Sequence, residues 1–250
     1  MRELTILITM AGRNRRFTDA GYALPKYMLD AHGKTIFEYS LGSLPLEMAT
    51  QIIFVGLADH ELKFSLTKFI EHKLPACMPQ KRVIDSKVLL LGAVTNGQAE
   101  TAYAARNLID PNEGVLIYNI DTCFESPTLQ VRLEKGDFDG LLGAFTIEGN
   151  DPKWSFAKVD SEGRVMETAE KVQISQFALT GLYHFSRAGD FFKTAKAMID
   201  SGKKDKGEFY IAPLYNDLIR AGRRIVLDME AKVIPLGTPE DYEAFKKCKK

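Results

Sequence analysis

Residues 4–17, LTILITMAGRNRRF, contain the feature that decides the fold: a mostly apolar run that leads directly into a basic loop. Such a run, ended by a glycine-bearing loop, is typical of a buried parallel strand. Loops at the carboxyl ends of parallel strands open a crevice, where successive backbone N–H groups and arginine side chains hold phosphates. We therefore expect a polyphosphate at this loop, on Met10, Ala11, Gly12, Arg13, Asn14 and Arg15.

The longer run MAGRNRRFTDAGYALPK, residues 10–26, resembles the signature loop of the sugar-phosphate nucleotidyltransferases, which join an NTP to a small phosphorylated molecule. It is most similar to the branch often found with capsule and surface-polysaccharide genes, whose spacing it matches without a gap. In the pattern of that branch, Asn14 stands where a second glycine is found and Arg15 where Ser or Thr is found. Because Asn is the non-glycine residue that best tolerates a positive φ, we expect the loop to keep its shape.

Composition indicates one globular domain over residues 1–250, with 45% apolar and 26% charged residues. The formal net charge is zero, so the sequence does not favour binding to nucleic acid or to an anionic membrane. The three cysteines are odd in number and lack metal-ligand spacing, which fits free thiols in a reducing cytoplasm. No apolar run approaches the roughly 20 residues of a membrane span, and no secretory signal is recognisable.

The pattern of apolar residues changes near the middle of the chain. Up to residue 138, expected strands alternate with expected helices, which predicts a parallel sheet covered on both faces: strands at 4–9, 51–56, 82–89 and 114–120, and helices at 35–44, 60–73, 98–108 and 127–135. From residue 139 the pattern is antiparallel α+β, with strands at 141–147, 156–159, 165–167, 178–185 and 224–229, and helices at 188–201, 211–221 and 239–247.

The resemblance implies an α/β fold of the nucleotidyltransferase (GT-A-like) type, with a Rossmann-like mixed central sheet in three α/β/α layers. Residues 1–138 would form the nucleotide-binding half of this single domain, and residues 139–250 the acceptor-substrate half.

Three residues of the first half would take part in the chemistry. By resemblance, Lys26 contacts the α-phosphate and Arg16 the β- and γ-phosphates, where its planar fork can make two bonds. Asp121 follows an expected strand, and the resemblance makes it the ligand of a catalytic Mg²⁺, an ion that prefers one or two carboxylates with phosphates and water. The plain alternatives are a solvated lysine at 26 and a helix cap at 121, although Ser126 suits a cap better.

Residues 96–101, NGQAET, open an expected helix and resemble the family segment that closes around the nucleobase. Gly97 would let the backbone approach the base, and Gln98 can both donate and accept hydrogen bonds. A plain helix start packed through alanines is an equally open interpretation.

In the second half, Glu170-Lys171 resembles the family Glu-Lys pair, whose lysine binds the phosphate of the acceptor. The flanking segments 154–160 and 179–185 also match, and the resemblance assigns acceptor binding to Glu170, Thr180 and Gly181.

Two C-terminal stretches also match the capsule-type branch: GEFYIAP at 207–213 and LGTPEDY at 236–242. Many relatives carry a second metal-binding Asp two residues before this Gly-Thr, where Pro235 stands here. Three alternatives stay open: the metal is held by Asp121 and phosphates alone, Asp228 substitutes for the missing acid, or activity is lowered or lost.

These observations predict a cytoplasmic, Mg²⁺-dependent nucleotidyltransferase that makes capsule or surface-polysaccharide precursors from an NTP and a sugar 1-phosphate or similar acceptor, with a homo-oligomer as an open possibility. One alternative is a GT-A glycosyltransferase that uses an NDP-sugar, but its usual Asp-x-Asp is absent because Cys123 follows Asp121 and Thr122. Another is a non-catalytic nucleotide- or sugar-nucleotide-binding module.

Overall fold

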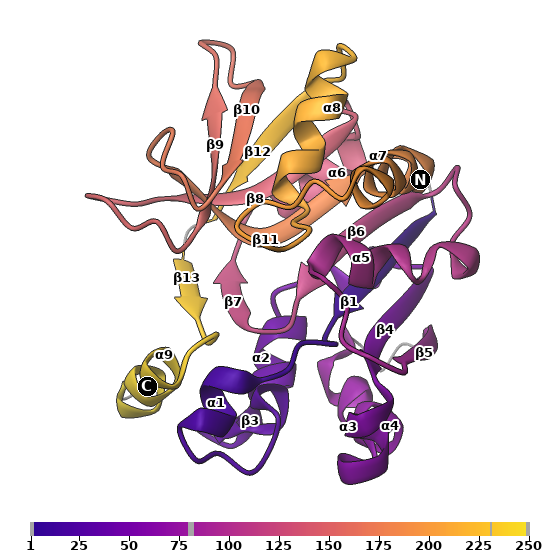
Figure 1. Ribbon diagram of the computed structural model, residues 1–250, viewed down its shortest axis with the longest axis vertical. Coiled ribbons are helices and arrows are strands. Elements are labelled where there is room, and N and C mark those ends of the chain that lie inside the picture. Colours follow the sequence, from indigo (N-terminus) through magenta and orange to yellow (C-terminus); the bar gives the residue numbers. More distant parts are fainter. Residues whose placement is uncertain (1–2, 80–82, 231, 249–250) are drawn as a thin grey trace.

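The protein is built around one large mixed β-sheet. The structure is a computed structural model that describes residues 3–79, 83–230 and 232–248. Within these residues, nine strands form the sheet, in the order β10-β9-β11-β6-β1-β4-β5, with β8 beside β11 and β12 beside β8 (Figure 1). The strands are β1 (Leu4–Thr9), β4 (Gln51–Leu57), β5 (Asp85–Leu91), β6 (Gly114–Asn119), β8 (Gly140–Thr146), β9 (Ser155–Val159), β10 (Val165–Glu170), β11 (Phe177–Phe185) and β12 (Ile225–Met229).

The first-half strands are parallel, as the sequence predicts: β1 pairs with β4 and β6, and β4 pairs with β5. Their carboxyl ends therefore lie at one edge, where the loops after β1 and β6 meet. The expected strand at 82–89 is Asp85–Leu91, and residue 82 lies outside the described residues. From β11 onward the pairing is mostly antiparallel, with β11 against β6, β8 and β9.

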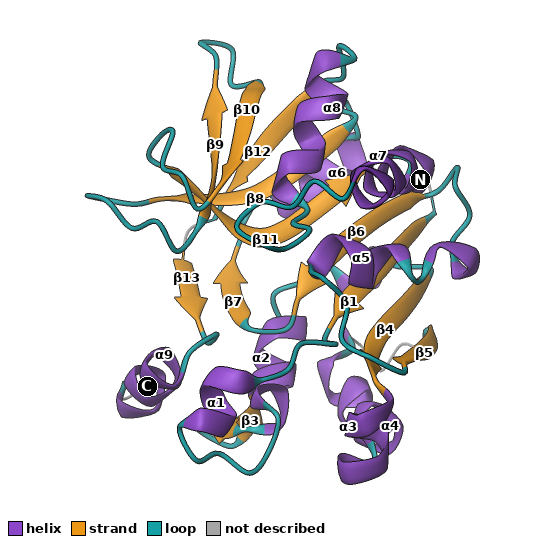
Figure 2. Ribbon diagram, viewed as in Figure 1, coloured by secondary structure: helices purple, strands orange, loops and turns teal. Residues whose placement is uncertain are grey.

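Helices cover both faces of the sheet, which confirms the three-layer α/β/α expectation (Figure 2). Alternate residues of β1 divide between two apolar cores: Leu7 belongs to one, and Ile6 and Ile8 to the other. The first core includes residues of α5 (Gln98–Tyr103), α7 (Ala188–Ser201) and α8 (Tyr215–Arg220); the second includes residues of α2 (Ile36–Leu41), α4 (Leu66–Cys77) and α6 (Leu129–Lys135). Because both faces are covered, the central strands are mostly apolar, and the threonines of β1, Thr5 and Thr9, are buried with them.

Several helices differ from the expected ranges. The helix predicted at 60–73 is two helices, α3 (Ala58–Phe64) and α4, because Ser65 between them adopts a left-handed φ of 52°. The helices predicted at 98–108 and 211–221 each keep one α-helical segment, α5 and α8, next to a short 3₁₀ turn. Among the described residues, no helix is long and apolar enough to cross a membrane.

The C-terminal segment returns to the first half of the chain. Strand β13 (Lys232–Pro235) pairs antiparallel with β7 (Thr122–Glu125), and α9 (Pro239–Lys247) follows. Figure 1 shows α9 beside α1 (Arg15–Asp19), and one small core joins them through Phe17 and Tyr242. A short hairpin, β2 (Asp30–Ala31) and β3 (Lys34–Thr35), lies in the same region. This arrangement brings the end of the chain against the loop that follows β1.

Candidate active site

The loop after β1 turns at Asn14, which adopts a left-handed conformation with φ 54° and ψ 22°. This confirms the expectation that Asn at this place tolerates a positive φ. The side chain also joins two parts of the site: Oδ1 accepts a hydrogen bond from the backbone N–H of Lys26 at 3.1 Å, and Nδ2 donates to the carbonyl of Leu24 at 3.4 Å. Asn14 therefore fixes the backbone that leads to Lys26.

A cavity of about 660 Å³ opens at the carboxyl ends of the parallel strands. The structure brings together around it every residue that the sequence assigns to the nucleotide: Met10, Ala11, Gly12, Arg13, Asn14, Arg15, Arg16, Lys26, Gly97, Gln98 and Asp121. A Cβ at Gly12 would meet nothing within 4 Å, so the loop backbone here is open toward the cavity. Arg13, Arg15 and Arg16 are exposed, and Arg15 also pairs with Asp19 at 3.4 Å.

Lys26 and Asp121 meet in this cavity. The Nζ of Lys26 lies 2.5 Å from Oδ2 of Asp121, and their side chains are 25% and 20% exposed. Asn119, the last residue of β6, donates its amide to the other carboxylate oxygen. Burial by itself would raise the pKa of Asp121, but the charge and hydrogen bond of Lys26, with the Asn119 bond, outweigh it and hold the pKa below its ordinary value. The carboxylate is therefore ionised at neutral pH.

A second cavity of about 400 Å³ adjoins the first and contains Glu170, Lys171, Thr180 and Gly181. The residues that line both cavities are Arg16, Gln98, Asn119, Asp121 and Gly237. Asp121 thus stands at the junction of a large cavity and a smaller one.

The residues predicted to bind the acceptor face this second cavity in different ways. Glu170 is only 8% exposed, its carboxylate accepts a hydrogen bond from Ser155, and burial raises its pKa. Thr180 is 1% exposed and donates to the buried Glu230 at 3.0 Å. Gly181 has a φ of 91°, and a Cβ there would lie 2.0 Å from Oδ1 of Asn119. Lys171 also lines this cavity and is the positively charged residue among these four.

Gly97 has a structural requirement that the sequence did not suggest. Its φ is 143°, and a Cβ would lie 2.5 Å from both the backbone N and O of Phe209. The glycine is therefore needed for close packing of two chain segments as well as for an open cavity wall. Gln98 donates to the Thr9 hydroxyl at 3.1 Å.

Asp228, the other carboxylate considered for a metal, is fully buried and lines neither cavity. Its two oxygens accept hydrogen bonds from Ser126 and Thr128, at 2.5 and 2.6 Å. The Ser126 hydroxyl also accepts from the N–H of Leu129, the first residue of α6, at 3.0 Å, while Thr128 is the N-cap residue, so Asp121 does not cap this helix. The position two residues before Gly237 is Pro235, which pairs with Thr122 in the small sheet.

Sequence reasoning gave no role to several residues that line the cavities. His60 and Tyr27 line the larger one, and their side chains share a hydrogen bond of 2.9 Å. Trp154, Tyr210 and Asp241 line the smaller one. All three lie inside stretches that match the family, at 154–160, 207–213 and 236–242, which was the available signal. Asp241 reaches the site only because β13 pairs with β7 and the N–H of Leu236 donates to the carbonyl of Asp121, at 2.8 Å.

Solved structures share this architecture. A nucleoside-diphosphate-sugar pyrophosphorylase from Vibrio cholerae RC9 is 34% identical with a TM-score of 0.82, over 97% of this chain and 100% of that chain. A putative glucose-1-phosphate thymidylyltransferase from Bacillus anthracis, solved with sucrose, is 15% identical with a TM-score of 0.76, over 97% of this chain and 94% of that one. The inositol-1-phosphate CTP transferase from T. maritima is 14% identical with a TM-score of 0.72, over 99% and 96%. At 15% and 14% identity, these last two structures establish the shared fold alone.

No protein-family model matches the chain, and the search of curated proteins found no match. The alignment with the Vibrio cholerae protein spans nearly all of both chains. The loop at residues 10–26, which carries the resemblance in the sequence, lines the larger of the two adjoining cavities. The chain therefore belongs to the sugar-phosphate nucleotidyltransferases and is an enzyme of that family.

Proposed function

We propose that this enzyme transfers a nucleoside monophosphate from an NTP to the phosphate of a sugar 1-phosphate or a similar small acceptor, and releases pyrophosphate. The observation that carries the proposal is the pair of cavities, of about 660 and 400 Å³, that adjoin at Asp121. With the NTP in the larger cavity and the acceptor in the smaller one, an acceptor phosphate oxygen bonds to the α-phosphorus while the bond to the leaving pyrophosphate breaks.

Such a reaction depends on positioning and on neutralising charge rather than on covalent help from the protein. Lys26 would stabilise the α-phosphate beside the junction of the cavities. Arg16, which lines both cavities, would contact the β- and γ-phosphates and then the leaving pyrophosphate. Lys171 would hold the attacking phosphate.

The residues at the junction fit a magnesium ion. The ionised Asp121 is partly exposed there, and no cluster of three or more His, Cys, Asp or Glu side chains suited to a metal occurs in the described ranges. Mg²⁺ is usually held by one or two carboxylates with substrate phosphates and water, so one carboxylate suffices. When bound, it would neutralise charge that develops on the α-phosphate of the transferred nucleotidyl group. A cation at Asp121 would compete with Lys26 for Oδ2.

We assign the product to nucleotide-sugar synthesis for capsule or surface polysaccharide in the cytoplasm, because the loop at residues 10–26 matches that branch in spacing. The names of the compared proteins include a nucleoside-diphosphate-sugar pyrophosphorylase, a glucose-1-phosphate thymidylyltransferase and an inositol-1-phosphate CTP transferase. The glycosyltransferase alternative is not favoured, because these proteins are nucleotidyltransferases and Cys123 stands where that class has its second acid.

The proposal is tested first by thermal shift with CTP, UTP, GTP, ATP and dTTP, each with and without Mg²⁺. An NTP at 100 times its Kd should stabilise the protein by about 2.7 kcal/mol. Pyrophosphate release is then measured with that NTP and a panel of sugar 1-phosphates. Asp121→Asn should lower the rate on the order of 100-fold, whereas the matched control Asp59→Asn, an exposed carboxylate paired with Lys63, should leave it unchanged. A shift with an NDP-sugar and with no NTP would contradict the proposal.

A further inference from the structure

One short segment, residues 207–210, runs from one cavity to the other. Gly207 and Glu208 line the larger cavity, and Tyr210 lines the smaller one. The segment opens the stretch 207–213, which matches the capsule-type branch, and the roles proposed for nucleotidyl transfer leave it without a function. Its contacts on either side suggest what it does.

On the side of the larger cavity, the segment is fixed to the loop that precedes α5 and to the first turn of that helix. The backbone N–H of Phe209 donates to the carbonyl of Asn96 at 2.8 Å, and the carbonyl of Phe209 accepts from the N–H of Ala99 at 2.9 Å. The absent Cβ of Gly97 leaves the room that the Phe209 backbone fills. Lys204 contacts both segments, since its ammonium donates to the side chain of Asn96 at 2.7 Å and lies 5.2 Å from the centre of the Phe209 ring. The backbone of Phe209, the residue before Tyr210, is therefore fixed through both its N–H and its carbonyl.

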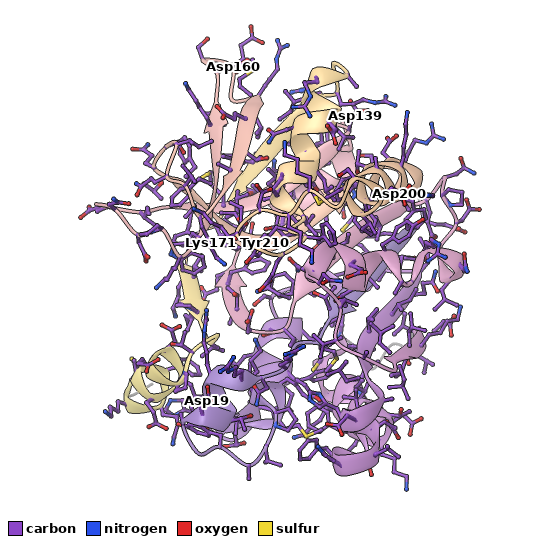
Figure 3. All side chains as sticks on the ribbon, in the orientation of Figure 1. Asp19, Asp139, Asp160, Lys171, Asp200 and Tyr210 are labelled. Carbon is purple, nitrogen blue, oxygen red and sulfur yellow. The ribbon has the colours of Figure 1, made fainter. Side chains whose placement is uncertain are left out.

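On the side of the smaller cavity, Tyr210 holds the ammonium of Lys171. The Nζ of Lys171 lies 2.5 Å from the phenol oxygen and 4.7 Å from the centre of the ring. Figure 3 labels the two residues next to each other. The backbone of Lys171 is left-handed, with a φ of 53°, and its N–H donates to the carbonyl of Trp154 at 3.1 Å. A lysine in this conformation costs on the order of 1–2 kcal/mol. Such strain persists where the surroundings fix it and is frequent at functional sites.

A tyrosine is suited to this task for two reasons. Burial raises the pKa of Tyr210, so the phenol stays neutral and does not cancel the charge of the lysine. The phenol oxygen accepts a hydrogen bond from one of the three N–H groups of the ammonium, which leaves two N–H groups to donate to the oxygens of a phosphate. The carboxylate of Glu170, next to Lys171 in the chain, accepts its hydrogen bond from the hydroxyl of Ser155. A lysine otherwise carries large rotamer entropy, which binding would have to remove.

We infer that Tyr210 is a positioning residue, which presents the ammonium of Lys171 to the acceptor phosphate from a place set by the nucleotide-side loop through Phe209. This inference rests on the proposed function, because it concerns the acceptor of that reaction. It adds a residue that acts on acceptor binding without touching the transferred nucleotidyl group.

The first test is steady-state kinetics of Tyr210→Phe, which removes the hydrogen bond and keeps the ring. The KM for the acceptor should rise about tenfold, while the KM for the NTP and the thermal midpoint stay near wild type. In a Lys171→Met background, Tyr210→Phe should cause no further rise. Tyr103→Phe, on α5 and outside both cavities, is the matched control and should change nothing. An unchanged acceptor KM in Tyr210→Phe, or an equal rise with and without Lys171, would overturn the inference.

The second test needs no turnover. Trp154 is the one tryptophan of the chain and lines the smaller cavity, so its fluorescence can follow the binding of inorganic phosphate there. Tyr210→Phe should weaken phosphate binding about tenfold, and Lys171→Met should remove it. If phosphate binds to Tyr210→Phe as to the wild type, the inference fails. If both variants weaken phosphate binding as expected but no NTP and acceptor release pyrophosphate, the proposed function fails and the role of Tyr210 at Lys171 stands.

Discussion

Replacing Lys26 by methionine, Asp121 by asparagine, and then both, should separate what this pair does for stability from what it does for catalysis. The two groups lie 2.5 Å apart, and each side chain is about three-quarters buried, at 25% and 20% exposure. Removing one partner of a fully buried pair costs about 3–5 kcal/mol, because a charge is left uncompensated. Partial exposure screens that charge, so we expect about 1–3 kcal/mol for each single variant.

The two single variants should not be equal. In Lys26→Met the carboxylate stays at the end of β6, held by Asn119, and its pKa rises because burial is no longer opposed by the lysine. In Asp121→Asn the flexible lysine can turn toward water. We therefore expect Lys26→Met to be the more destabilising. Since the folded pKa of Asp121 is lowered, the stability it contributes is present at neutral pH and is lost as the pH falls below the ordinary range of Asp.

The assay is urea unfolding at pH 7.5, with pyrophosphate release measured on the same samples. The double variant should recover about 1–2 kcal/mol of stability relative to the sum of the two singles, yet its rate should remain at least about 100-fold below wild type. The exposed pair Lys63–Asp59, at 2.9 Å with 61% and 59% exposure, is the matched control, and its coupling should not exceed about 0.5 kcal/mol. Strict additivity of the Lys26 and Asp121 variants in stability, or near-wild-type turnover in the double variant, would refute this reasoning.

Three further predictions follow from contacts of single residues. Asn14→Ala should destabilise the protein by about 1–2 kcal/mol more than Asn14→Gly, because glycine tolerates the left-handed φ and alanine does not. Both variants should raise the KM for the NTP, because the hydrogen bond to the backbone N–H of Lys26 is lost. Equal urea midpoints for the two variants would contradict the stability prediction. Gly97→Ala should lose about 2 kcal/mol or more in urea unfolding, since its Cβ meets the Phe209 backbone at 2.5 Å, and wild-type stability would argue against that packing. Burial raises the pKa of Glu230 from 4.5 to about 9, so the stability of the wild type should fall as the pH rises through that window. Glu230→Gln should remove this pH dependence and gain up to about 3 kcal/mol of stability at pH 7. Urea unfolding of both proteins from pH 5 to 9 measures this, and stability curves of wild type and variant that run parallel with pH would exclude the effect.

Local pattern was sufficient for the long, regular elements of this protein. The strand at 4–9 and the helices at 188–201 and 239–247 match their expected bounds, because an apolar strand run and two amphipathic helices with clear ends encode themselves locally. The family resemblance and the fold class were also within reach of the sequence, since they depend on the loop at 10–26 and on alternating elements. Short elements such as α1, β7 and β13 carry too few residues to show a period, and they were not expected.

The sequence by itself determined that the loop after β1 lines the larger cavity, because a loop after a parallel strand must lie at the carboxyl edge of the sheet, and it determined that Asn14 would tolerate its backbone conformation. Only the tertiary structure decided the partners. Lys26 meets Asp121 across 95 residues of sequence, and Lys171 meets Tyr210 across 39. No periodicity in the chain encodes such contacts, because they depend on how the strands are ordered in the sheet and on where the loops between them meet.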